Sequence, residues 1–256
     1  MGNISYYGMR TIVLMKLKIF IKEFQYSIIS PIVSSIIFII ILATISEFYD
    51  LRNEDNSSYM VFVIPGIIIM IVIQETYANI SETLIHMKQT GSFNDILMSP
   101  ISRIEIALSL MIASLFIGLI ICITNLIVIS LFFDIYLYNI YRAIFYISIT
   151  SIIFGSFGSI IGFVSYTWDT QQSFFNFLIV PISLLSGTFF SVTVIESEWK
   201  SFFMLNPFYY LVSYFRKGFD INQSYDLKVD IMLVIIGFFI VYSMIYIFKK
   251  GYKVIN

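Results

Sequence analysis

Long, nearly uninterrupted runs of apolar residues restrict the fold of this chain more than any other feature. A run of about 20 predominantly apolar residues is what one α-helix needs to cross about 30 Å of hydrocarbon. Several runs of this length are present, and we therefore predict an all-α, polytopic membrane protein with six transmembrane helices. The predicted spans cover residues 28–46, 60–84, 104–133, 142–166, 173–192 and 229–248.

The composition agrees with a membrane protein and excludes several other classes. Of the 256 residues, 59% are hydrophobic and 12% are charged, against roughly 45–50% apolar and about 25% charged residues in a soluble domain. The formal net charge is −1, and there is no basic stripe of the kind that nucleic-acid binding requires. One cysteine, Cys122, and one histidine, His86, are too few for a disulfide or a zinc site. We expect neither a nucleic-acid partner nor a metal.

Two segments outside the spans mix charged with apolar residues. Residues 5–26 alternate basic and apolar positions, which is typical of an amphipathic helix lying at the membrane face, with its lysines near lipid headgroups. Residues 193–228 combine charged and aromatic side chains, which indicates short helices at the outer interface or dipping into it. Residues 1–256 together are expected to form a single transmembrane domain.

The second half of the second predicted span is polar. Glu75, Asn79, Glu82 and His86 are spaced by four, three and four residues, so they share one side of a helix. Because carboxylates are costly against lipid, this stripe should face protein or a water-filled path. It is either the lining of a cytoplasmic entrance or an internal network that fixes one helix against its neighbours.

The fourth predicted span contains closely spaced glycines. Gly158 and Gly162 form a Gly-x-x-x-Gly pair, which permits two helix backbones to approach closely. We expect a packing role for this pair, and the alternative is a moving hinge.

The distribution of lysine and arginine predicts the orientation. With the N-terminus in the cytoplasm, nine of the 15 basic residues fall on the cytoplasmic side and six fall outside. Cytoplasmic segments of membrane proteins carry such an excess of positive charge. We therefore expect a multi-pass protein of the plasma (inner) membrane with both termini in the cytoplasm.

Four short motifs follow one another along the chain in a characteristic order. They are Val63-Ile64-Pro65-Gly66, Ile96-Leu97-Met98-Ser99-Pro100, the run from Pro181 to Phe190, and Leu205-Asn206-Pro207-Phe208-Tyr209-Tyr210 with Arg216 and Gly218 just beyond. Together with the predicted helices, their order and spacing resemble those of ABC transporter permeases of the type-2 exporter class. The resemblance covers most of the chain.

This resemblance implies partners. In that family a permease pairs with a second permease and with two cytoplasmic ATP-binding subunits, so we expect two copies of an ABC ATP-binding subunit, a second and identical permease, and membrane lipid. The partner ATPase would bind ATP and Mg²⁺, since this sequence has no Gly-x-x-x-x-Gly-Lys-Ser/Thr phosphate-binding loop. We expect no cofactor and no catalytic residue on this chain.

The resemblance also implies a coupling helix between the second and third spans. This segment would contact the ATPase beside the N-terminal helix, through Phe93, Asn94, Asp95, Ile96, Leu97 and Arg103. In a short helix Phe93, Ile96 and Leu97 would share one apolar face, which we expect to anchor the partner. The alternative is an ordinary solvated loop.

The segment before the last span would form short re-entrant helices at the outer end. Its candidate residues are Asn206, Pro207, Tyr210 and Arg216. Proline disfavours helical conformation at the residue before it, so Asn206 should mark a turn. The aromatic residues here serve either an outer gate or an interfacial belt.

We therefore predict the permease subunit of an ATP-driven ABC exporter, acting as a homodimer. Its substrate would be an amphipathic, lipid, glycan or drug-like molecule moved from the cytoplasm outward. The alternatives are a membrane-embedded lipid-modifying enzyme and a passive channel or scaffold. An enzyme would need a nucleophile or metal set that the sequence does not contain, and a passive pore would leave residues 87–103 without a purpose.

Overall fold

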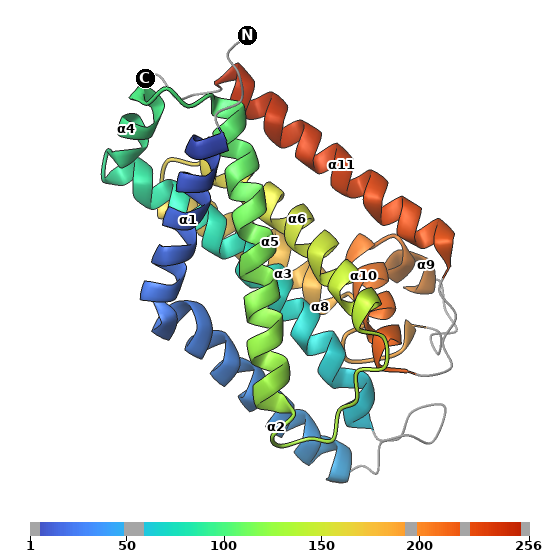
Figure 1. The fold of residues 1–256 in the computed structure, drawn as a ribbon. Coiled ribbons are helices and arrows are strands. Elements are labelled where there is room, and N and C mark those ends of the chain that lie inside the picture. The colour runs from blue at the N-terminus through green and yellow to red at the C-terminus, as the bar shows by residue number, and fades with distance from the viewer. Residues whose placement is uncertain (1–5, 49–58, 193–198, 221–225, 252–256) are drawn as a thin grey trace.

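We describe a computed structural model of the chain, which places residues 6–48, 59–192, 199–220 and 226–251. In these residues the regular structure is helical, with no β-strand among them. The predicted all-α fold class is therefore confirmed (Figure 1). Residues 1–5, 49–58, 193–198, 221–225 and 252–256 lie outside the described residues, and they include parts of the predicted segments 5–26 and 193–228.

Five helical segments in the described part of the chain are long and apolar enough to cross a membrane. The first combines a π-helical turn, η1 (Gln25–Ile29), with α2 (Ser30–Phe48). The others are α3 (Tyr59–Gln89), α5 (Arg103–Ile129), α6 (Ile140–Val164) and α11 (Leu227–Lys250). They overlap five of the six predicted spans. The third span ends at Ile129, earlier than predicted, because residues 130–133 turn out of the helix.

The region of the fifth predicted span, 173–192, differs from the prediction. A helical stretch begins at Trp168 and consists of α7 (Trp168–Phe174, 7 residues), the π-helical η2 (Phe175–Ile179, 5 residues) and α8 (Val180–Leu184, 5 residues). The polar residues 168–172, which lie before the predicted span, are helical because Thr167 caps them, accepting from the Thr170 N–H at 3.3 Å. Pro181 has no N–H to donate, and the hydrogen-bond ladder changes to the π pattern just before it.

Shorter helices lie toward both ends of the bundle. They are α1 (Tyr6–Lys22), α4 (Ser92–Met98), α9 (Trp199–Met204), α10 (Pro207–Arg216) and the 3₁₀ turn η4 (Lys217–Phe219). Figure 1 shows α4, the start of α1 and the C-terminal end of α11 at one end, with α9 and α10 toward the other.

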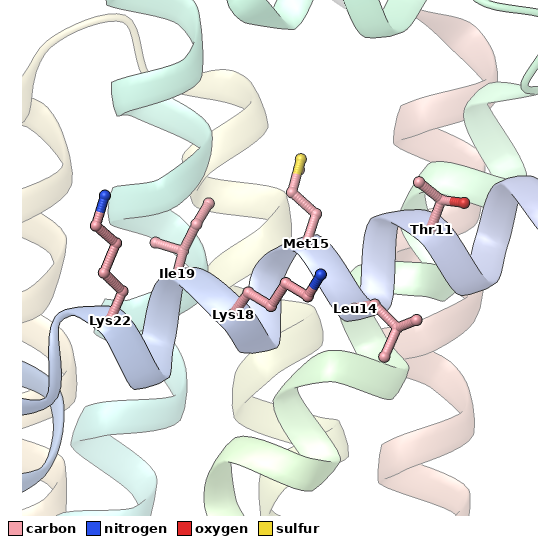
Figure 2. A pocket seen from close by; sticks show the side chains of 6 residues that line it. All are labelled: Thr11, Leu14, Met15, Lys18, Ile19 and Lys22. Carbon is pink, nitrogen blue, oxygen red and sulfur yellow. The ribbon is translucent and has the colours of Figure 1, made fainter.

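The helix α1 crosses the long helices beside it instead of running parallel to them, as Figure 2 shows. Its inward residues Ile12, Lys16 and Phe20 recur every four positions and are buried. Its outer side carries an open pocket of about 420 Å³ that is lined by α1 alone, through Thr11, Leu14, Met15, Lys18, Ile19 and Lys22 (Figure 2).

The central helix α6 packs against α3, α5 and α11. A Cβ atom added to Gly158 would lie 2.5 Å from the carbonyl oxygen of Tyr77 on α3, and one added to Gly162 would lie 2.8 Å from the backbone of Ser81. Both glycines therefore stand where two helix backbones meet, and the expected packing role is confirmed. A Cβ on Gly155 would similarly meet Ser114 of α5, at 2.1 Å.

Charged side chains fasten both ends of α6. At its C-terminal end, Lys88 of α3 donates to three carbonyl oxygens, including that of Ser165 at 2.9 Å. A cation at this position also interacts favourably with the helix dipole. At the other end, Arg142 forms an ion pair with the largely buried Asp230 of α11 at 2.5 Å, and the Tyr146 hydroxyl donates to the same carboxylate.

We expect Gly158→Ala to lower the thermal midpoint of the purified chain in detergent and Gly237→Ala not to lower it. Alanine gains about 1 kcal/mol over glycine in a helix at both positions. At 158 the new methyl group meets the Tyr77 carbonyl at 2.5 Å, whereas at 237 its nearest neighbour is Ile153 at 3.5 Å. Overpacking costs about 1–3 kcal/mol. Equal midpoints for the two variants would contradict the close contact between α3 and α6.

Candidate functional site

The helix α4 joins α3 to α5 at one end of the bundle. The chain turns out of α3 at Gly91, whose φ of 77° is accessible to glycine without steric cost. Phe93 is only 3% exposed and packs edge-on against Phe163 of α6, with ring centroids 6.2 Å apart. Ile96 and Leu97 are half-buried against the same core. The apolar face of α4 therefore holds the helix to its own chain.

Phe93 is therefore not exposed as the expected anchor for a partner, whereas Ile96 and Leu97 are half-buried and their coupling role stays a prediction. A seven-residue helix beside a bundle buries its apolar face against the nearest core, and periodicity alone does not say which surface covers that face. The outward side chains are those of Asn94, Asp95 and Met98, and Met98 is 86% exposed. Residues 92–98 are helical, so the alternative of a solvated loop does not describe them.

Arg103 belongs to a contact within the chain. It begins α5 directly after Ser102, which forms a capping box with Glu105: the Glu105 N–H donates to Ser102 at 3.2 Å, and the Ser102 N–H donates to Glu105 at 2.7 Å. The Arg103 guanidinium lies over Gly251 at the C-cap of α11, where a Cβ would meet it at 2.1 Å. A positive charge is favourable at a helix C-terminus, so Arg103 links the start of α5 to the end of α11.

The helix α1 packs mainly against α5, and it meets the polar stripe of α3 through Lys16. Glu75 and Asn79 are half-buried, and Glu82 and His86 are exposed. The Lys16 ammonium donates to the backbone carbonyl of Asn79 at 3.0 Å and to the Thr83 hydroxyl, one turn further along α3. The side-chain oxygen of Asn79 is buried and accepts no hydrogen bond from the described residues.

Lys16 points inward, in contrast to the prediction that the lysines of residues 5–26 lie near lipid headgroups. The sequence spacing could have predicted this direction, because Lys16 lies four residues from both Ile12 and Phe20, the apolar residues that face inward with it. Burial lowers the pKa of Lys16 to about 8, and the nearby carboxylates of Glu23 and Glu82 oppose that shift.

The Asn206-Pro207 pair starts α10 and fastens it to α8. The side-chain oxygen of Asn206 accepts from the Phe208 N–H at 3.0 Å, which makes it the N-cap, and Pro207 occupies the first helical position. The Asn206 amide group donates to the carbonyls of Ile182 and Leu185 at 2.9 and 3.2 Å. These carbonyls lie at the C-terminal end of α8 and would otherwise lack helical partners.

Arg216, at the other end of α10, connects three parts of the chain. Its Nε donates to the Phe62 carbonyl of α3 at 2.8 Å, and its Nη2 donates to the carbonyls of Gly187 and Thr188 at 3.1 and 3.2 Å. The guanidinium also lies 3.6 Å from the centre of the Phe62 ring. A Cβ on Gly66 would come within 2.9 Å of Nη2, so the Pro65-Gly66 motif leaves room for the guanidinium.

Tyr210, the remaining outer candidate, is half-buried on α10 and packs against the apolar core, edge-on to Tyr209 with centroids 5.2 Å apart. Asn206, Pro207, Tyr210 and Arg216 are thus brought together on one helix, whereas the coupling and stripe residues lie toward the opposite end (Figure 1). Within the described ranges, no three His, Cys, Asp or Glu side chains gather closely enough to hold a metal ion.

Comparison with known proteins identifies relatives over most of the chain. The model of the family described as ABC-2 type transporter matches residues 8–219. The chain is 25% identical over 239 residues to the inner membrane transport permease YadH of Escherichia coli strain K12, covering 88% of this chain and 90% of that relative. The YadH permeases of Escherichia coli O157:H7 and Shigella flexneri give the same values.

We expect Arg216→Lys to lower the thermal midpoint of the purified chain, with Lys228→Met as a control. A lysine ammonium is a point charge and cannot span the carbonyls of α3 and of the turn after α8 as the planar guanidinium does. Losing one or two hydrogen bonds to a charged donor should cost about 2–4 kcal/mol. Lys228 is exposed at the same end of the bundle, so its replacement should change little. An unchanged midpoint for Arg216→Lys would contradict a stabilising role for the hydrogen bonds of Arg216 to α3 and to the turn after α8.

Proposed function

The chain belongs to the ABC-2 type transporter family, and from this premise we propose that it is the membrane-spanning permease subunit of an ATP-driven exporter. Membership of the family and the similarity to inner membrane transport permeases make it a transport subunit. The further proposal is that it acts as a homodimer bound to two copies of an ATP-binding subunit, which bind ATP and Mg²⁺. The complex would move an amphipathic, lipid, glycan or drug-like molecule outward.

One observation favours ATP-driven transport over a passive channel or scaffold. The helix α4 is packed against the bundle on one face and exposes side chains on the other. Phe93 fixes it to α6, while Asn94, Asp95 and Met98 point away from the core. Nucleotide binding shifts a membrane domain only through a contact whose strength differs between states. A helix that lies between α3 and α5 in the chain and packs on α6 can pass such a shift to the membrane helices.

The proposed topology has both termini in the cytoplasm. The start of α1, the helix α4 and the C-terminal end of α11 share one end of the bundle (Figure 1), and the basic residues favour the cytoplasm for that end. In this topology α1 lies at the cytoplasmic interface, the stretch 168–184 makes the fifth of six crossings, and α10 enters from the outer side. The polar stripe of Glu75, Asn79 and Glu82 then lines the cytoplasmic entrance, and the outer exit lies near Tyr210.

We expect Asp95→Lys and Met98→Asp to weaken co-purification with the ATP-binding subunit. Burying a methionine side chain in an interface is worth roughly 1.5–3 kcal/mol, which corresponds to about one to two powers of ten in affinity. Met98→Leu, which keeps an apolar side chain of similar volume, is the control and should bind normally. Phe93→Ala should instead lower the amount of folded permease. Unchanged binding and export with both charged variants would count against ATP-driven coupling through α4.

The topology is tested with single cysteines in a variant that lacks Cys122. We expect Asn94→Cys to react with an impermeant thiol reagent only after the cells are permeabilised, because Asn94 is exposed at the proposed cytoplasmic end. Tyr141→Cys, at the start of α6 and 84% exposed in the native side chain, should react in intact cells. The opposite labelling pattern would reverse the proposed orientation.

A further inference from the structure

Lys16 is buried in a contact between two segments that are far apart in the sequence. Its side chain is 3% exposed and lies between the inward residues Ile12 and Phe20 of α1. Its ammonium donates to the Asn79 carbonyl at 3.0 Å and to the Thr83 hydroxyl, both on α3. Lysine is rarely this buried without a paired charge, and both of its hydrogen-bond acceptors here are neutral.

The helix α3 does not need this ammonium for its own hydrogen bonding. The Thr83 hydroxyl already donates to the Asn79 carbonyl at 2.7 Å, and that carbonyl lies in the interior of a continuous helix. Removing the ammonium would therefore leave no buried acceptor without a donor. A buried ion in such a position is weak evidence for stability, and replacement by an apolar group of similar volume is often neutral or stabilising.

Two carboxylates attract the ammonium of Lys16. Glu82 belongs to the polar stripe of α3, and Glu23 follows the end of α1. Burial disfavours the charged form of Lys16 and lowers its pKa to about 8, whereas the two carboxylates favour the charged form. A shift of α1 along α3 that brings the ammonium to the carboxylate of Glu82 would relieve this cost.

We propose that Lys16 is a positioning residue that couples α1 to α3, by exchanging its neutral acceptors at Asn79 and Thr83 for the carboxylate of Glu82 as the two helices shift. The contact then has two arrangements of different free energy, which is what a coupling element requires. Movement of α1 at the cytoplasmic end is passed directly to the polar stripe. The inference rests on the proposed function in so far as nucleotide drives that shift.

Three substitutions separate this role from simple packing. Lys16→Met keeps a long, flexible apolar stem and removes the ammonium, and Lys16→Arg keeps a cation and its donors. Lys18→Met is the matched control, because Lys18 is exposed on the outer side of the same helix (Figure 2). We expect the thermal midpoint of Lys16→Met to equal or exceed that of the unmodified chain.

The positional test uses the purified chain alone, in lipid nanodiscs. Spin labels on Thr11→Cys of α1 and Asn94→Cys of α4, in a variant lacking Cys122, report the distance between α1 and α4, the helix that directly follows α3. We expect Lys16→Met to broaden this distance distribution and Lys18→Met to leave it unchanged.

In cells, we expect Lys16→Met to lower export per ATP hydrolysed about tenfold, within the range of ordinary coupling free energies, and Lys16→Arg to restore most of it.

Two results would overturn the inference. One is an unchanged distance distribution with unchanged export in Lys16→Met. The other is a fall in the thermal midpoint together with export, without rescue by Lys16→Arg, because that pattern describes a packing residue. If the unmodified permease neither binds nor is driven by an ATPase, the proposed function fails, yet the distance measurement on the isolated chain still decides whether Lys16 holds α1 to α3.

Discussion

The close backbone contact between α3 and α6 is the constraint on which the rest of this structure depends. In lipid there is little hydrophobic force to bring apolar helices together, so association relies on packing and on polar bonds. Gly158 and Gly162 remove the side chains that would hold α6 away from α3, and Lys88 then closes the end of the pair by donating to the last carbonyls of α6. Because α6 is fixed in this way, Phe163 is in place to receive Phe93, and α4 has a rigid seat.

The helix α3 also connects the two candidate regions. With 31 residues it is about 46 Å long, and it carries the polar stripe and the Lys16 contact in its second half and the carbonyl held by Arg216 near its start. Pro65 interrupts the hydrogen-bond ladder of its first turns. The missing bond is the one to the Val61 carbonyl, and Arg216 binds the neighbouring Phe62 carbonyl from outside the helix. A displacement at the α4 end can therefore reach the outer end through one continuous element.

The apolar runs predicted which segments are helical, because run length and helix length are linked directly by the thickness of the hydrocarbon. The glycine pair predicted a close helix contact for an equally direct steric reason. Prediction failed where a pattern defines a face but not its neighbour. Phe93 was assigned to a partner and packs on Phe163 instead, and Lys16 was assigned to lipid and packs on α3. Residues 168–172 lie outside the predicted span because they are polar, yet Thr167 caps them as the start of a helix.

The contacts of Asn206 and Arg216 bring together motifs that are distant in the sequence. Pro65-Gly66 makes room for the guanidinium, the turn at Gly187 presents two carbonyls to it, and Asn206 and Arg216 hold the two ends of α10. Moving α10 alone would separate the guanidinium from the turn carbonyls of Gly187 and Thr188, which lie outside any helix. An unsatisfied polar group in a nonpolar setting costs several kcal/mol, so α10 is unsuited to act as an independent lid. Any movement at this end should therefore carry α10, the turn after α8 and the start of α3 as one unit.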